Sequence, residues 1–289
     1  IMKLKFVKLN GLFFLILFVL FSCSKDPETI IETVEVVKEV EVTVTETVEV
    51  DPFADSTLEG VLTSDKTLSS DKIWLIKGRV VVGDGATLTI PAGTVIKAEP
   101  GSGADASTLI IARGGKIDAK GTASKPIIMT AKADNIQADG TYPATGASLT
   151  VNSRGLWGGL LVLGKAPSSF KGDVSELQIE GIPVSDTNGL YGGSVSDDNS
   201  GTMQYISIRH GGAEIGEGNE INGLTLGGVG SGTVIEHIEV IANVDDGIEF
   251  FGGTVNASYL LVWGQGDDAL DIDQAYSGTL DDAYVILED

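Results

Sequence analysis

The stretch His237-Ile238-Glu239-Val240 and the block Asp245-Asp246-Gly247-Ile248-Glu249 that follows it decide the fold, because both return 22 residues further on. Their second copies read Tyr259-Leu260-Leu261-Val262 and Asp267-Asp268-Ala269-Leu270-Asp271. Repetition at a fixed period of this length is typical of solenoid proteins, in which each repeat forms one coil. Equivalent residues of successive coils should then stack in ladders about 4.8 Å apart.

Segments upstream follow the same pattern of short apolar stretches separated by glycine turns. Residues 85–96 form two alternating stretches around a turn, and residues 109–122 repeat this arrangement. Ser200-Gly201-Thr202 returns as Ser231-Gly232-Thr233 after a longer interval than the C-terminal period, which predicts one coil with an insertion. A β-sandwich is the alternative, but its hairpins need turns between matched strands, and Asn188-Gly189 joins no such strands. The sequence therefore predicts an all-β fold, a parallel β-helix.

The composition agrees with a fold of short strands and tight turns. The chain has 289 residues, of which 38 are glycine, and only 6% are aromatic. Its 19 Lys and Arg stand against 41 Asp and Glu, and the formal charge of −22 excludes binding to nucleic acid. The single cysteine excludes an internal disulfide and a Cys-based zinc site.

The N-terminus predicts a lipid anchor. A basic stretch over residues 2–8 precedes an apolar run over residues 12–21, which is too short to span a bilayer and is typical of a signal peptide. Leu20-Phe21-Ser22-Cys23 resembles the lipobox of bacterial lipoproteins, in which the cysteine is acylated after cleavage. We therefore expect a signal peptide over residues 1–22, lipidation of Cys23, and attachment to a membrane.

The next segment predicts a location and a spacer. Ser24-Lys25-Asp26-Pro27-Glu28 is similar to the surface-export signal of Bacteroidota lipoproteins, which favours the outer surface of the outer membrane over its periplasmic face. Valine alternates with Glu and Thr from residue 33 to residue 50, so residues 23–52 should form an extended acidic spacer. Pairing of this ribbon with another chain is the alternative. The β-helix should cover residues 53–289, and we expect further coils because residues 285–289 end in mid-strand.

Three blocks rich in glycine and aspartate carry a family resemblance. They are residues 154–160 (RGLWGGL), residues 219–233 (NEINGLTLGGVGSGT) and residues 245–253 (DDGIEFFGG). From about Trp74 to its end, the chain resembles an uncharacterised family of right-handed β-helix lipoproteins from Bacteroidota. The resemblance implies a right-handed parallel β-helix in the cell envelope and implies no activity.

The repeat should also stack carboxylates on neighbouring coils. Carboxylates that repel one another favour a hard cation such as Ca²⁺, which prefers oxygen ligands. The alternative is that each aspartate caps a turn by accepting backbone N–H groups. The calcium hypothesis includes Asp245, Asp246, Asp267, Asp268 and Asp271.

A catalytic interpretation uses some of the same residues. Asp246-Gly247 and Gly266-Asp267-Asp268 resemble blocks of polygalacturonase-like β-helix hydrolases. The resemblance implies Asp246, Asp267 and Asp268 as the acids and base of glycoside hydrolysis. The chain departs from that pattern, because Val244-Asp245 stands where Asn-Thr is expected and no His-Gly block follows. A polysaccharide lyase with calcium and an Arg or Lys base is a further alternative.

Three other residues are candidates for ligand binding. Trp157 lies in a glycine-rich turn, where its ring should be exposed and able to stack on a sugar. Arg209 and His210 precede two glycines and bring a cation and an imidazole together at such a turn. Trp263 ends an apolar stretch and should be buried in the core.

These features predict a surface-anchored lipoprotein whose acidic β-helix binds an extracellular ligand, either a glycan or a partner protein. Catalysis is not expected, and calcium is expected at the stacked aspartates. A polysaccharide-degrading enzyme is the first alternative, and a structural protein of the envelope is the second.

Overall fold

The structure, a computed structural model, describes residues 52–287 except residues 173, 217 and 218. The predicted signal peptide, the lipidation site Cys23 and the predicted spacer up to residue 51 lie outside the described residues. Within the described ranges, no helix has the length and the hydropathy that crossing a membrane requires.

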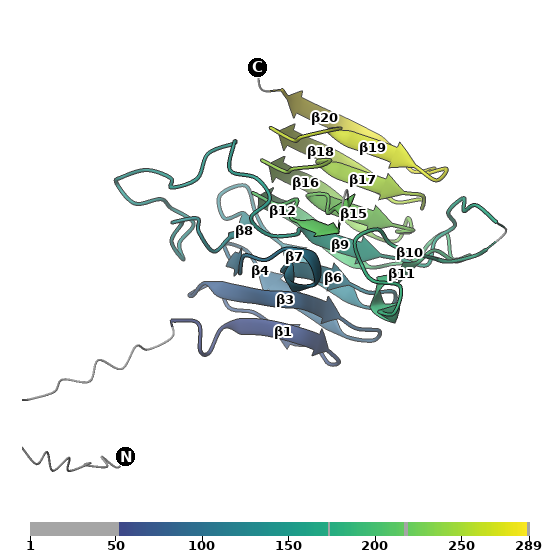
Figure 1. Cartoon of the computed structure of the whole chain (residues 1–289), viewed down its shortest axis with the longest axis horizontal. Helices are drawn as coiled ribbons and strands as arrows, with labels where there is room; N and C mark the ends of the chain where they lie inside the picture. The colour runs from purple at the N-terminus through teal and green to yellow at the C-terminus, as the bar shows by residue number, and fades with distance from the viewer. Residues whose placement is uncertain (1–51, 173, 217–218, 288–289) are drawn as a thin grey trace, which may run out of the picture. The chain divides into compact units, whose positions relative to one another are not determined.

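Twenty β-strands and two short 3₁₀ helices make up the described chain (Figure 1). The helices are η1 (Gly103–Asp105) and η2 (Thr187–Gly189). The strands are β1 (Thr57–Leu62), β2 (Lys66–Thr67), β3 (Trp74–Val82), β4 (Thr87–Pro91), β5 (Val95–Ala98), β6 (Thr108–Ile111), β7 (Lys116–Lys120), β8 (Ile127–Ala131), β9 (Leu160–Leu163), β10 (Leu177–Gln178), β11 (Leu190–Tyr191), β12 (Gly201–Arg209), β13 (Glu214–Gly216), β14 (Asn219–Glu220), β15 (Leu224–Gly227), β16 (Val234–Ile241), β17 (Ile248–Phe251), β18 (Asn256–Trp263), β19 (Leu270–Asp273) and β20 (Leu280–Ile286).

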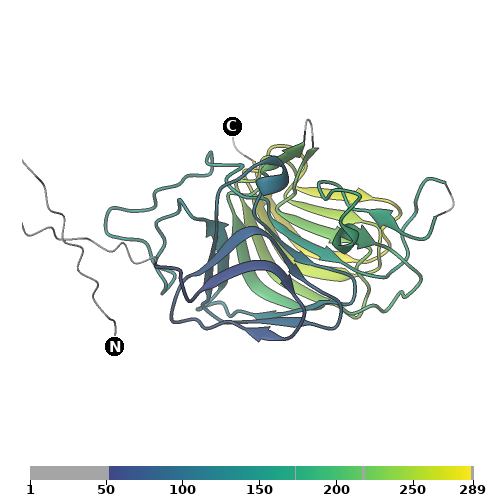
Figure 2. The ribbon, with the colours of Figure 1, turned by 60° about the horizontal axis from the view of Figure 1, so that its bottom comes forward.

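The strands wind into coils with three faces, and each face is a ladder of parallel pairs (Figure 2). The first face contains β2, β4, β7 and the first parts of β12, β16, β18 and β20. The second face contains the first part of β3, then β5, β8 and the second parts of the same four long strands. The third face contains the second part of β3, then β6, β9, β15, β17 and β19. The predicted parallel β-helix is therefore confirmed.

The register of the strands confirms the period of the C-terminal coils. Ile238 in β16 pairs with Leu260 in β18, and Glu249 in β17 pairs with Asp271 in β19. In both cases the partner is the residue that the repeat in the sequence aligns with it, one full period further along the chain. Side chains at equivalent positions therefore form ladders that run along the solenoid.

The spacing that the tripeptide repeat predicts for the preceding coil is one residue too short. The repeated tripeptide aligns Thr202 with Thr233, whereas Thr202 in β12 pairs with Val234 in β16. The error arises because Thr233 lies in the turn before β16. A turn accepts a shift of one residue without disturbing the ladder beside it.

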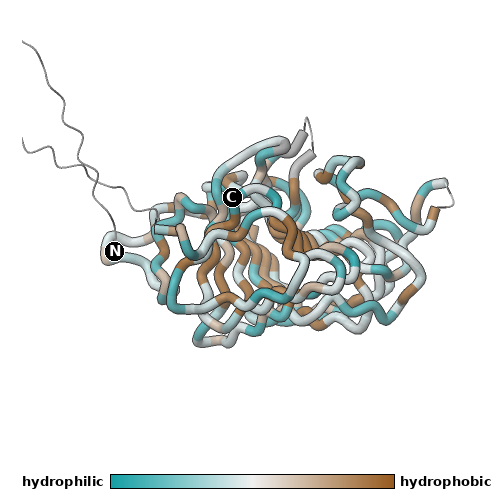
Figure 3. Tube along the Cα trace, turned by 90° about the horizontal axis from the view of Figure 1, so that it is seen from below, coloured by the Kyte–Doolittle hydropathy of each residue, from teal (hydrophilic) through white to brown (hydrophobic). Residues whose placement is uncertain are grey.

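Inward side chains form one hydrophobic core along the coils, as the stacked hydrophobic positions in Figure 3 show. Because successive Cβ atoms of a strand point to opposite sides, Ile248 and Phe250 of β17 both face this core and are fully buried. Each fully buried side chain of this size contributes roughly 1.5–3 kcal/mol to folding. Stacking of such residues on every coil therefore provides most of the hydrophobic stabilisation.

Three insertions leave the coils between strands. They follow β8 (residues 132–159), β9 (residues 164–200) and β12 (residues 210–223). The second insertion packs its Ile179 and Tyr191 on the outer side of the third face, in one buried apolar cluster with Leu161. That side of the sheet is therefore covered by protein over part of its length.

Residues in the left-handed conformation form the corner between the first and second faces. Tyr205, His237, Tyr259 and Asp282 have φ angles of 52°, 55°, 58° and 53°, respectively. Non-glycine residues adopt such angles uncommonly, and here the angle recurs at one position of four successive long strands. Each of these residues bends its strand from one face to the next.

Candidate functional site

One column of outward side chains on the third face changes from apolar to acidic along the coils. The neighbours of Glu249 in β17 fill the core, so the Glu249 carboxyl points away from it. The period of the repeat then places the Asp271 carboxyl on the next rung. In register, the members of this column are Val81, Ile110, Leu161, Thr225, Glu249 and Asp271.

Asp246 lies in the turn before β17 and connects two coils. Its Oδ1 accepts a hydrogen bond of 2.9 Å from the backbone N–H of Asp268 on the next coil. Nδ2 of Asn243 donates a hydrogen bond of 2.8 Å to the backbone carbonyl of Asp246, which fixes this turn. Asp246 therefore accepts a backbone N–H, as the turn-capping interpretation expects, but the N–H belongs to the turn of the next coil and not to its own turn.

Two groups of carboxylates share Asp246. Within each group, one oxygen of each residue lies within 4.8 Å of the others. Of the five aspartates in the calcium hypothesis, only Asp268 has its side chain in neither group, among the described residues. The first group consists of Asp245, Asp246 and Asp267, and the second group consists of Asp246, Glu249 and Asp271.

Asn222 adds an amide to the second group. Its Nδ2 donates a hydrogen bond to Oε2 of Glu249, and the residue is only 5% exposed. Its Oδ1 is buried and accepts no hydrogen bond from any described residue. A buried polar atom without a partner costs about 1–3 kcal/mol unless a ligand satisfies it. The amide contacts Glu249 through its nitrogen, and turning it over would present this oxygen to the carboxylates as a ligand atom.

Burial and repulsion raise the pKa values of the two inner carboxyls. The pKa of Glu249 rises to about 9, first because burial disfavours its charged form and then because Asp246 and Asp271 repel it. The pKa of Asp246 rises to about 6, again mainly through burial, with repulsion from Asp245 and Asp271. No ion pair between described residues includes any acid of the second group. A bound cation would therefore supply the positive charge that no described side chain brings to these carboxylates.

The dimensions of the second group suit a small cation better than a sugar. Ca²⁺ binds oxygen at about 2.3–2.6 Å, so ligand oxygens on opposite sides of one ion lie roughly 5 Å apart. Oxygens within 4.8 Å of one another are therefore within reach of a single ion. Asp246 and Glu249 are each 7% exposed, so a pyranose ring has little access to either carboxyl.

Two of the predicted ligand-binding residues are buried. Trp157 lies in the core, and its Nε1 donates a hydrogen bond of 2.7 Å to the carbonyl of Arg209. The expectation of an exposed Trp157 ring is therefore wrong, because the strand β12 of a later coil covers the turn. His210 is also buried, its Nδ1 lies 2.7 Å from the carbonyl of Ser153, and burial lowers its pKa. Trp263, expected in the core, is 37% exposed instead.

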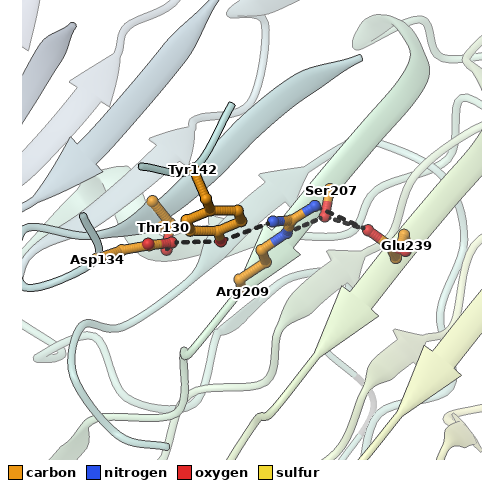
Figure 4. Close-up of polar contacts among 6 residues, drawn as sticks. All are labelled: Thr130, Asp134, Tyr142, Ser207, Arg209 and Glu239. Atoms are coloured by element: carbon orange, nitrogen blue, oxygen red, sulfur yellow. Dashed lines mark hydrogen bonds and ion pairs between the residues drawn. The ribbon is translucent and has the colours of Figure 1, made fainter. Parts of the chain in front are cut away.

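Arg209, the third predicted ligand-binding residue, belongs to a chain of polar contacts (Figure 4). Its Nη1 donates to the hydroxyl of Tyr142 at 3.1 Å, and that hydroxyl donates to Oδ2 of Asp134 at 3.2 Å. Its Nε donates to Oγ of Ser207 at 2.7 Å, and its Nη2 lies 3.5 Å from Oε2 of Glu239. The guanidinium therefore ties the insertion after β8 to the second face, and these contacts engage it within the protein.

Two residues of the site were not assigned to it from the sequence. Glu249 takes the place in the second group that the calcium hypothesis gave to other acids. The repeat contained the signal, because it aligns Glu249 with Asp271. Asn222 gave no such signal, since it belongs to the insertion after β12 and reaches Glu249 only in the folded chain.

Comparison with known proteins identifies the domain. Residues 60–289 match the family model described as the pectate-lyase-like β-helix domain. Neither a curated protein nor a solved structure gives a significant match to the chain.

Proposed function

Because the chain belongs to the pectate-lyase-like β-helix family, we propose that it is a carbohydrate-binding protein without catalytic activity. Calcium, bound by the carboxylates of Asp246, Glu249 and Asp271 and by the amide oxygen of Asn222, holds its C-terminal coils together. The acylated Cys23 anchors the protein in the outer membrane, and the β-helix faces the cell exterior.

The calcium assignment is supported by one observation above all. Asp246 and Glu249 are buried beside Asp271, and no ion pair of a described residue offsets their charge. The amide of Asn222 contacts Glu249 through Nδ2, and its Oδ1 has no partner among the described residues. Three carboxylates in this position cost free energy when ionised, and they need either protons or a cation. Calcium supplies the charge, and the amide oxygen completes an all-oxygen ligand set.

The ligands belong to three consecutive coils. Asn222 precedes β15, Asp246 and Glu249 belong to the turn before β17 and to β17 itself, and Asp271 belongs to β19. An ion that binds all four joins these coils across the outer side of the third face. Its role is therefore to stabilise the solenoid, because nearest-neighbour contacts set the stability of repeat proteins.

A role without catalysis is supported by the burial of the same carboxyls. A general acid must come within hydrogen-bond distance of the glycosidic oxygen, and the buried Asp246 and Glu249 leave no room for this. The hydrolase alternative is favoured by the pKa of Asp246 near 6, which suits an acid, but it also needs Asp268. The side chain of Asp268 lies outside both carboxylate groups.

Calorimetric titration of calcium into the chelator-stripped protein tests the calcium site. We expect one tight site in the wild type, loss of that site in Glu249→Gln and Asp271→Asn, and no change in Asp268→Asn. The Asp268 variant is a matched control, because it removes a neighbouring carboxylate that lies outside the groups. Unchanged calcium binding in Glu249→Gln would refute the assignment.

A panel of bacterial and plant polysaccharides tests the carbohydrate role. We expect binding without release of reducing or unsaturated ends. Release of such ends by the wild type and its loss in Asp268→Asn would establish the enzyme instead. Binding to no glycan would favour a partner protein or a structural role in the envelope.

A further inference from the structure

A groove lies on the outer side of the first face, away from the carboxylates of the third face. It has a volume of about 450 Å³ and follows three coils, because its walls come from β16, β18, β20 and the turns before them. Its polar lining includes Ser231, Thr233, Glu236, Asn256, Ser258, Thr279 and Asp281. Hydroxyl, amide and carboxylate groups of this kind form hydrogen bonds with polyhydroxylated ligands.

The polar groups of the groove are held in place by the ladder. Glu236, Ser258 and Asp281 occupy one outward column on successive coils. Nε2 of Gln204, one coil earlier, donates a hydrogen bond of 2.8 Å to Oε2 of Glu236. The backbone N–H of Thr279 donates to Oδ1 of Asn256 at 2.9 Å. The site is therefore organised before any ligand binds, which lowers the cost of binding.

The charge of the groove restricts its ligand. Glu236 and Asp281 line it, and none of the described lining residues is a lysine or an arginine. The formal charge of the whole chain is −22. An anionic polysaccharide would be repelled from this surface, whereas an uncharged sugar would not.

A stack of aromatic rings follows the outward column of the groove in the strands, at the corner of the first face. Tyr205, His237 and Tyr259 directly follow Gln204, Glu236 and Ser258 in their strands and form the corner of the first face. The ring centroids of Tyr205 and His237 are 4.1 Å apart, and those of His237 and Tyr259 are 4.4 Å apart. The ring planes differ by 9° and 6°, so the three rings form one rigid stack.

The stack ends at Tyr259. On the next coil the corner position is Asp282, which has the same left-handed conformation but carries a carboxylate instead of a ring. Among the described residues, no aromatic ring covers the second face of Tyr259, and this residue is 49% exposed. A sugar ring could pack its C–H face on Tyr259 at the level of Asp282, where hydroxyl groups meet the carboxylate.

We propose that the groove of the first face and the ring of Tyr259 bind an uncharged pyranose unit of a glycan. Tyr259 packs on the sugar ring, and Glu236, Ser258 and Asp281 accept or donate hydrogen bonds to its hydroxyls. This inference rests on the carbohydrate binding proposed above and names the surface and the class of sugar. The surface is separate from the calcium site, which lies on the third face.

Calorimetric titration of the full chain in calcium-containing buffer with defined hexasaccharides tests the proposal. The neutral probes are xylohexaose, mannohexaose and cellohexaose, and the anionic probe is hexagalacturonate. We expect one of the neutral probes to bind and hexagalacturonate not to bind. Tyr259→Ala and Glu236→Gln should each weaken the neutral interaction about tenfold or more. Tyr284→Ala is the matched control, since Tyr284 is an exposed tyrosine of the second face outside the groove, and it should bind as the wild type does.

The outcomes separate this proposal from the function on which it rests. If Tyr259→Ala and Glu236→Gln bind the neutral hexasaccharide as the wild type does, the assignment to the groove is wrong and the carbohydrate role stands. Binding of hexagalacturonate alone would overturn the class of sugar. A folded wild type that binds no probe would overturn both the groove and the carbohydrate role. Melting curves of every variant show whether lost binding reflects lost folding.

Discussion

Oδ1 of Asp246 lies 2.9 Å from the backbone nitrogen of Asp268, one period of the repeat further along the chain. One carboxylate thus caps the turn of the next coil and also belongs to both acidic groups. Turn capping and cation binding, the two interpretations that the sequence left open, therefore make different predictions for this one residue. They can be separated by substitution, because an amide keeps the acceptor and loses the charge.

Asp246→Asn should stabilise the calcium-free protein by about 1–2 kcal/mol, since it removes a buried charge and keeps the acceptor for the Asp268 N–H. The same variant should lose most of its stabilisation by calcium. Asp246→Ala removes the acceptor as well and should be less stable than Asp246→Asn by about 1 kcal/mol. Denaturant titrations with and without calcium measure these differences. Equal stability of the two variants would show that the hydrogen bond contributes nothing.

Without calcium, stability should fall as the pH rises from about 4.5 to about 9. The pKa of Glu249 is raised from 4.5 to about 9 in the folded protein, so the folded state binds more protons than the unfolded state over this range. The stabilisation is complete below the unfolded pKa and is lost as the pH passes the folded value. We expect a loss of about 1–3 kcal/mol, because the neighbouring acids titrate together with Glu249. Denaturation midpoints in chelator at several pH values measure it.

Glu249→Gln provides the control for this pH dependence. The variant replaces the carboxyl by an amide of the same shape that has no proton to lose. Most of the loss of stability between these pH values should therefore disappear. Saturating calcium should flatten the decline in the wild type, since the ion stabilises the charged form. A decline that is the same in Glu249→Gln would assign it to other groups.

Trp157→Ala should destabilise the protein by about 3–5 kcal/mol, because it leaves a cavity in the core and removes the hydrogen bond to the Arg209 carbonyl. Trp263→Ala is the matched control, and its partly exposed ring should cost about 1 kcal/mol or less. Thermal melting of the two variants tests the reversed burial of the two tryptophans. A larger loss for Trp263→Ala would contradict the structure.

Tyr142→Phe should loosen the insertion after β8. The variant removes the hydroxyl that accepts from Arg209 and donates to Asp134, at a cost of about 1–2 kcal/mol. Hydrogen exchange should rise over residues 132–159 and stay unchanged in β17 and β19. Tyr284→Phe, which removes an exposed hydroxyl, should leave exchange as in the wild type. Unchanged exchange in Tyr142→Phe would show that the polar chain does not hold the insertion.

The fold could be predicted from the sequence because each coil repeats the same contacts. Glu249 and Asp271 are partners in a ladder, and a shift of the sequence by one period is enough to place one on the other. The spacing predicted for the preceding coil was wrong by one residue, because Thr233 lies in a turn. A turn can contain an additional residue without changing the pairing of the strands beside it. Prediction is therefore good where strands stack and weaker where the chain leaves the coil.

The burial of single side chains could not be predicted in the same way. Trp157 is covered by residues from another coil, and the Arg209 carbonyl that it contacts lies 52 positions away. Asn222 reaches Glu249 on the next coil from an insertion that belongs to no repeat. Contacts of this kind depend on how the insertions fold back on the solenoid. Neither the periodicity nor the composition of the sequence predicts the conformation of these insertions.

The change from apolar to acidic residues along the column of Glu249 also bears on how the chain folds. Coils of similar length can in principle stack one step out of place, because each offers the same backbone hydrogen bonds. One step backward would carry Glu249 to the rung of Thr225, which is buried and lies next to Leu161 and the apolar cluster that Tyr191 and Ile179 form with it. A carboxylate at that rung would lose its solvation without a partner, which costs several kcal/mol. The acids therefore favour one stacking register of the coils during folding, because a shifted register would bury a carboxylate.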